Sequence, residues 1–119
     1  MKDKLDSHTI SKQLQQVDDE KVELSKKETL WEEYQDHWDY IQQQEQDVLS
    51  EIDYLSQQTT SARDASQQLD IFEEERGEHR RFVMEIEDEF DQKKKKLITL
   101  EDDLNEDYYE AKKEEAAND

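Results

Sequence analysis

The chain has 119 residues and a formal net charge of −19, with 43% charged residues, 31% hydrophobic residues, one glycine and no proline or cysteine. The lack of cysteine excludes disulfides, thiolate zinc sites and cysteine nucleophiles. The excess of carboxylates repels the phosphates of nucleic acids and of anionic lipids, and no apolar run of transmembrane length occurs, so we expect no nucleic-acid partner and no direct membrane insertion.

The first predicted helix spans about residues 9–56. Its leading apolar column has one residue in every seven and consists of Ile10, Val17, Leu24, Trp31, Trp38 and Ile52, with Glu45 between the last two. A second column, three residues later, contains Tyr34, Ile41, Val48 and Leu55. Two such columns form the stripe of a packed helix, and the second is polar before residue 31. The pattern therefore predicts tight packing from about residue 30 to 56 and looser packing toward the start of the helix.

A short turn is predicted at about residues 57–61, because the leading column changes phase between Ile52 and Leu69. This interval reads Gln-Gln-Thr-Thr-Ser and contains weak helix formers whose hydroxyl groups can cap a new helix. We therefore predict an all-α fold, an elongated antiparallel two-helix hairpin of coiled-coil type that forms a single domain over residues 1–119. The turn has neither glycine nor proline, so a single long coiled-coil helix with a stammer is the alternative.

The second predicted helix spans about residues 62–113. One of its columns holds Leu69, Arg76, Val83, Phe90, Leu97, Leu104 and Ala111, and the other holds Phe72, His79, Ile86, Lys93 and Leu100. The basic run 93–96 is followed by an acidic stretch, so we expect these lysines to pair with carboxylates. Residues 114–119 carry no periodic apolar signal, and we expect them to form a frayed tail.

The candidate site is a partner-binding surface in the middle of the hairpin. Folding at about residue 60 places the aromatic residues of the first helix opposite an apolar stretch of the second, and brings Glu45 near Arg76 or His79. A tryptophan is too wide for one facing helix to cover, so a third helix is implied. The predicted partner-binding residues are Trp31, Tyr34, Trp38, Phe82, Val83, Ile86 and Phe90.

The sequence contains no motif for catalysis, for a cofactor or for a metal ion, and we expect a protein that is not an enzyme. A single glycine cannot build a phosphate-binding loop, an EF-hand loop or a nucleophile elbow. Glu33 and His37 lie four residues apart, as do Glu75 and His79, which suits either a pair of metal ligands or an ordinary contact on a helix. With 35 acidic residues such pairs are inevitable, so we interpret them as ordinary contacts.

A family resemblance adds to this interpretation. It rests on the chain length, on two heptad-rich helices with a short polar turn, and on the segments Leu30-Trp31-Glu32-Glu33-Tyr34, Phe72-Glu73-Glu74-Glu75-Arg76 and His79-Arg80-Arg81. Over most of its length the chain resembles the small α-helical proteins encoded beside LXG-domain toxins of the type VII secretion systems of Gram-positive bacteria. The resemblance implies a targeting factor or chaperone that binds the helical N-terminal LXG region of a toxin before export.

Two departures limit what this resemblance implies. The Trp-x-Gly turn of the related WXG-type proteins is missing from residues 57–61. Their C-terminal export signal, an aromatic residue followed at the fourth position by an acidic one, is missing too, because Tyr108 is followed there by Lys112 and Tyr109 by Lys113. The resemblance then implies a cytoplasmic toxin-binding subunit that relies on a second small helical secretion protein and is open to co-secretion with its cargo.

Two functions of other classes stay open at the level of sequence. A self-associating structural coiled coil would bury the same apolar surplus in a homo-oligomer. An acidic inhibitor or immunity-type protein would use its negative surface to block a basic active site, and salt would then weaken its binding strongly.

Overall fold

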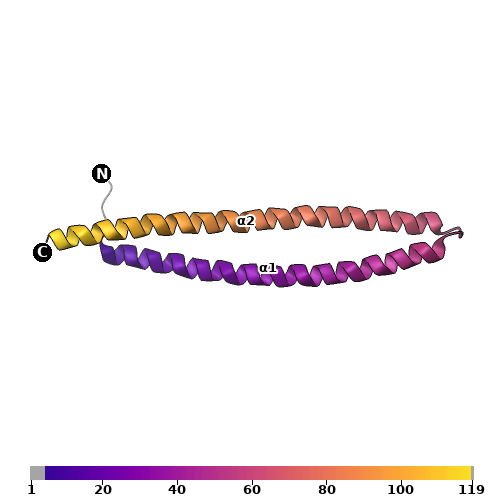
Figure 1. Ribbon diagram of the computed structural model, residues 1–119, viewed down its shortest axis with the longest axis horizontal. Coiled ribbons are helices and arrows are strands. Elements are labelled where there is room, and N and C mark those ends of the chain that lie inside the picture. The colour runs from indigo at the N-terminus through magenta and orange to yellow at the C-terminus, as the bar shows by residue number, and fades with distance from the viewer. Residues whose placement is uncertain (1–4, 119) are drawn as a thin grey trace. The chain divides into compact units, whose positions relative to one another are not determined.

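The computed structural model describes residues 5–118, which form two long helices and, over that range, no strand (Figure 1). Helix α1 spans Ser7–Ser56 and helix α2 spans Ala62–Ala117. The two helices form an antiparallel hairpin, which confirms the predicted all-α hairpin. The alternative of one uninterrupted helix is wrong, because residues 57–61 reverse the direction of the chain.

The turn between α1 and α2 works without glycine because a glutamine takes the conformation that glycine usually supplies. Gln58 has φ of 70°, in the left-handed region where a helix commonly ends. The hydroxyl and the backbone N–H of Thr59 both donate to the carbonyl of Ser56, at 2.5 and 3.0 Å. The N–H of Ser61 donates to the Thr59 hydroxyl oxygen at 3.2 Å, just before α2 begins. Hydroxyl groups therefore satisfy the backbone where the two helices meet.

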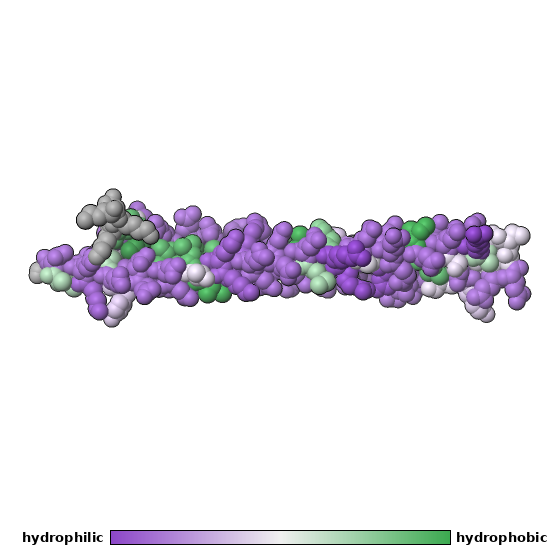
Figure 2. All heavy atoms as spheres, turned by 90° about the horizontal axis from the view of Figure 1, so that it is seen from above, coloured by the Kyte–Doolittle hydropathy of each residue, from purple (hydrophilic) through white to green (hydrophobic). Residues whose placement is uncertain are grey.

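The chain divides into two compact units, and each helix contributes a segment to both. Unit 1 combines residues 1–28 with residues 89–119, and unit 2 comprises residues 29–88. Figure 2 shows that hydrophobic residues lie on the visible face as separate patches within a mainly hydrophilic surface. Over the described residues, neither helix contains a segment that is both apolar and long enough to cross a membrane.

Unit 1 contains a continuous apolar core between its two helix segments. Ile10, Val17 and Leu104 are buried there, and the side chains packed against them are Leu14, Leu97, Tyr108 and Ala111. Ion pairs close the flanks of this core, from Lys21 to Glu101 and from Lys94 to Glu28, each at 2.6 Å. The lysine run therefore meets a carboxylate at Lys94, as predicted.

The first turn of α1 is capped from two sides. The Asp6 carboxylate accepts the backbone N–H of Thr9 at 2.8 Å, which satisfies one of the donors that a helix start leaves unpaired. The backbone N–H and the hydroxyl of Ser7 donate to the two carboxylate oxygens of Glu115, at 3.0 and 2.8 Å. These hydrogen bonds lower the pKa of Glu115, and those from Thr9 lower the pKa of Asp6.

The same contact corrects the prediction of a frayed C-terminal tail at 114–119. Helix α2 continues to Ala117, well past residue 113, and Asn118 still donates its N–H to the carbonyl of Glu114 at 3.1 Å. The physical reason is the pair of hydrogen bonds from Ser7 to Glu115, which join the last turns of α2 to the start of α1. The apolar pattern of the sequence does not indicate this polar contact. Residue 119 lies outside the described residues.

Packing of the α1 segment in unit 2 is the reverse of what its apolar columns predict, although Ala65 and Phe72 of α2 are buried there. The buried residues of α1 are Ser7, Ile10, Val17 and Leu24, all of them before residue 30, and none is buried in the segment predicted to pack tightly. The second column, Tyr34, Ile41, Val48 and Leu55, is exposed. The prediction of tight packing from residue 30 to 56 is therefore wrong.

The reason is that positions three and four residues after the leading column lie on opposite sides of it. The side four residues after the column faces α2. In unit 1 the positions four residues after the leading column, Leu14, Lys21 and Glu28, are all half-buried, whereas of those three residues after it only Gln13 is. Because α1 continues without a break, the same flank faces α2 in unit 2, where it presents Gln35, Gln42 and Leu49. The apolar flank three residues after the leading column is consequently turned away from α2.

Candidate partner-binding surface

Five rings from both helices form one connected group in unit 2. We call it the aromatic cluster, and it consists of Trp31, Tyr34, Trp38, His79 and Phe82. Trp31 stacks on Tyr34 with ring centroids 5.4 Å apart, and meets Phe82 edge-on at 5.8 Å. Both arrangements are favourable for aromatic pairs. Positions three or four residues apart on each helix bring these rings to adjoining faces.

His79 joins the two sides of the aromatic cluster. Its imidazole stacks on the indole of Trp38, with centroids 3.3 Å apart and 6° between the planes. The Tyr34 hydroxyl and His79 Nε2 are 3.5 Å apart. Burial lowers the pKa of His79 from its ordinary value of 6.5, and the opposing effect of the Asp39 carboxylate is smaller. His79 is therefore held in its neutral form near neutral pH.

The outer edge of the aromatic cluster is open to solvent. Trp31 and Trp38 are half-buried, whereas the side chains of Tyr34 and Phe82 are 43% and 45% exposed. The indole N–H of Trp31 is buried and has no hydrogen-bond partner among the described residues. Two facing helices thus cover the inner faces of the tryptophans and leave an aromatic edge uncovered, which is the kind of surface that protein partners bind most strongly.

Four of the seven predicted partner-binding residues meet in the aromatic cluster: Trp31, Tyr34, Trp38 and Phe82. Val83 and Ile86 are half-buried members of unit 2. Phe90 belongs to unit 1 and is half-buried there. His79 is the member of the aromatic cluster that was not among the predicted partner-binding residues. The sequence placed it in a packed column and four residues after Glu75, and its spacing of three from Phe82 signals a shared helical face.

The predicted contact of Glu45 with Arg76 or His79 is wrong. Arg76 donates from its guanidinium to the side-chain oxygen of Gln46, at 2.9 Å, and His79 faces Trp38. Glu45 is exposed. Gln46 takes this place because the face of α1 that packs on α2 here carries half-buried Gln42, Gln46 and Leu49, whereas the leading-column position 45 is exposed.

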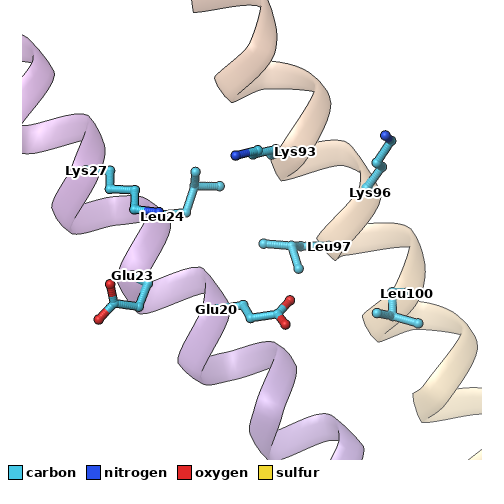
Figure 3. Close-up of a pocket in the computed structure, with 8 residues that line it drawn as sticks. All are labelled: Glu20, Glu23, Leu24, Lys27, Lys93, Lys96, Leu97 and Leu100. Atoms are coloured by element: carbon cyan, nitrogen blue, oxygen red, sulfur yellow. The ribbon is translucent and has the colours of Figure 1, made fainter.

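Unit 1 has a groove of about 450 Å³ between its two helix segments (Figure 3). Leu24 of α1 and Leu97 of α2 point toward one another across it. The remaining lining residues are Glu20, Glu23, Lys27, Lys93, Lys96 and Leu100. Leucines, lysines and glutamates with both signs of charge make an ordinary amphipathic seam, and this lining contains no histidine, serine or other nucleophile paired with a base.

The described residues also contain no group of three or more His, Asp or Glu side chains placed to hold a metal ion. In the pair Glu75 and His79, the His79 ring stacks on Trp38 and Glu75 is exposed. The aromatic cluster is therefore the best candidate for a functional site in this chain.

Comparison with known proteins gives no relative: no family model matches the sequence, and no curated protein or solved structure is significantly similar to it.

Proposed function

We propose that this chain is a helix-binding adaptor or chaperone, with no enzymatic activity, whose aromatic cluster packs against a helix of another protein. The observation that carries the proposal is the open edge of the aromatic cluster, where Tyr34 and Phe82 remain 43% and 45% exposed beside two half-buried tryptophans. A third helix laid along this edge would remove both rings from water.

The free energy that burial of these rings would contribute supports a binding surface over an ordinary exposed one. Fully burying a large apolar side chain contributes roughly 1.5–3 kcal/mol, and tryptophan and tyrosine are enriched among the residues that dominate protein interfaces. Tyr34 and Phe82 both lie against Trp31, so one partner helix would gain from both rings at once. The binding would be stoichiometric.

We further propose the helical N-terminal LXG region of a type VII secretion toxin as the partner. The support is the resemblance of segments 30–34, 72–76 and 79–81 to the small helical proteins encoded beside such toxins. Since the positions four residues after Tyr108 and Tyr109 are lysines, a second small helical protein would supply the export signal. The chain would then hold the toxin in the cytoplasm until export.

The test is capture of a purified LXG-region helical fragment by the tagged chain and its variants. We expect Trp31→Ala with Trp38→Ala to abolish capture. Tyr34→Ala with Phe82→Ala removes exposed rings only, so it should weaken capture about tenfold or more while the helix content in circular dichroism stays unchanged. The matched control is Tyr40→Ala with Tyr54→Ala, two tyrosines that are exposed outside the aromatic cluster.

Unchanged capture by both aromatic-cluster variants would show that this surface does not bind the partner. Failure of the unmodified chain to capture any LXG fragment, together with a stable dimer or tetramer in light scattering, would replace the adaptor function with a self-associating coiled coil.

A further inference from the structure

The exposed second column of α1 extends the candidate site into a long apolar strip. We call it the α1 stripe, and it consists of Leu30, Tyr34, Ile41, Val48, Ile52 and Leu55. Their exposed fractions lie between 43% and 67%. On a helix with 3.6 residues per turn these positions group about 100° away from the face that packs on α2, and they run for roughly 37 Å. Successive members of the α1 stripe are four, seven, seven, four and three residues apart, which keeps them on one face of the helix, and no helix is packed on them.

The α1 stripe is continuous with the aromatic cluster through Tyr34. Tyr34 and Phe82 lie against the same indole, that of Trp31, so the α1 stripe and Phe82 of α2 border one surface. Ile71, which is also exposed, precedes Phe82 by three turns and lies on the same face of α2. Both helices of unit 2 therefore offer apolar side chains to one occupant.

The charges around the α1 stripe have a single sign. Between Lys27 and Arg63 the chain has no lysine or arginine, although it has eight aspartates and glutamates from residue 29 to 61. Glu33, Glu45 and Glu51 are exposed and flank the α1 stripe at helical spacing. On α2, Glu75 and Glu78 are exposed and share the helical face of Ile71 and Phe82.

These charges discriminate between occupants. A second copy of this chain, docked through the same strip, would set carboxylates against carboxylates, and each copy carries a net charge of −19. Like charges in such positions oppose pairing, whereas a basic helix gains from every acidic neighbour. The acidic rim thus opposes self-docking on this face and favours a partner rich in lysine and arginine.

We propose that the α1 stripe, together with Ile71 and Phe82, receives an amphipathic helix of a different protein whose apolar face is bordered by lysine or arginine. This inference rests on the proposed helix-binding function and adds the place where the partner helix lies and the charge it carries. The partner helix runs along residues 30–55 as the third helix of a bundle in unit 2.

The test uses two synthetic peptides of about 28 residues, enough to span the α1 stripe at 1.5 Å per residue. Both carry leucine at heptad a and d positions, and the flanking e and g positions carry lysine in one peptide and glutamate in the other. Binding is followed by the fluorescence of Trp31 and Trp38, the two tryptophans of the chain. The variants are Ile41→Gln with Val48→Gln, and the control is Tyr40→Gln with Tyr54→Gln, since glutamine is a good helix former.

We expect the lysine peptide to bind one-to-one, to lose affinity as salt is raised, and to bind the Ile41→Gln, Val48→Gln variant about tenfold or more weakly than the control. The glutamate peptide should not bind. Lysine-peptide binding that is equal for variant and control would overturn the proposal, because charge alone would then explain it. A dimer that the stripe variant converts to monomer would also overturn it, in favour of a second copy.

This outcome is separable from that of the proposed function. If the Tyr34→Ala, Phe82→Ala variant loses the LXG fragment while Ile41→Gln, Val48→Gln retains it at full affinity, the adaptor function stands and the α1 stripe is not its docking surface. If the stripe variant loses lysine-peptide binding while the unmodified chain captures no LXG fragment, the α1 stripe is a docking surface for a basic helix and the proposed LXG partner is wrong.

Discussion

Unit 1 and unit 2 are built from the same two helices and the same leading column, yet they pack differently. In unit 1 the column residues Ile10 and Val17 are buried against Leu104. In unit 2 the same column supplies Trp31 and Trp38, which are only half-buried, and the buried residues there, Ala65 and Phe72, lie on α2. The difference teaches that one facing helix can bury aliphatic residues in a heptad column, whereas tryptophans in the same column are only half covered.

The largest expected effect comes from removing a core residue of unit 1. Leu104→Ala leaves a cavity beside Ile10 and Val17 and should lower the free energy of unfolding by about 2–4 kcal/mol in urea denaturation. The matched change in unit 2, Leu55→Ala, removes a leucine that is 67% exposed and should cost less than about 0.5 kcal/mol. Equal losses would contradict the difference in burial between Leu104 and Leu55.

A substitution in the turn of unit 2, at residues 57–61, should stabilise the chain. Gln58→Gly relieves a left-handed conformation that costs a non-glycine residue about 1–2 kcal/mol. Glycine also gives the unfolded chain more freedom, which cancels roughly 0.5–1 kcal/mol of this stabilisation. We therefore expect a net stabilisation of about 0.5 kcal/mol in thermal or urea unfolding. Gln57→Gly, at a position without positive φ, serves as the control and should destabilise.

Acid should loosen unit 2 through His79. Because its folded pKa is lowered by burial, the unfolded chain takes up a proton first, so the contribution of neutral His79 is complete above pH 6.5 and is lost as the pH falls through the lowered value. We expect Trp38 fluorescence to change over that interval and stability to fall with it. His79→Gln should remove this part of the pH dependence, and an unaltered profile in that variant would contradict the stacked, neutral histidine.

The smallest effect is local and lies at the open end of unit 1. Glu115→Gln weakens the hydrogen bonds from Ser7, so the amide N–H of Ser7 should exchange faster with deuterium, while exchange at Leu104 stays the same. The pKa of Glu115 is lowered in the folded chain. The stability that its hydrogen bonds with Ser7 contribute is therefore complete above the ordinary pKa of 4.5 and is lost as the pH falls through the lowered value. Glu110→Gln, at an exposed position, is the control.

Much of the fold is readable in the sequence because the apolar period is strong. It predicts two helices, the hairpin and an interval for the turn, and residues 57–61 separate the helices in the structure. It cannot tell which flank of the leading column faces α2, since positions three and four residues away are equally adjacent on a helix. The more apolar flank, with Ile41 and Val48, looks like the seam and is in fact exposed.

The same limit applies to contacts that depend on the register of the two helices. Arg76 donates a hydrogen bond to Gln46 and not to Glu45. Ser7 donates to Glu115 although the two are 108 residues apart in the chain. Neither pair has an apolar signal in the sequence. The aromatic cluster was within reach of sequence reasoning because tryptophan and tyrosine are large and rare, whereas His79 entered through a stacking geometry that spacing alone does not specify.

Hydrogen–deuterium exchange of the chain, alone and with the lysine-flanked peptide, is the most direct test of the central claim. The claim is that α1 is packed within unit 1 in the free chain, whereas in unit 2 it is fully packed only when a third helix binds. We expect residues 10–24 to be protected in the free chain, residues 34–55 to exchange faster, and the peptide to raise protection selectively at 34–55. Equal protection of both segments in the free chain, with no change at 34–55 on adding the peptide, would contradict this division of roles.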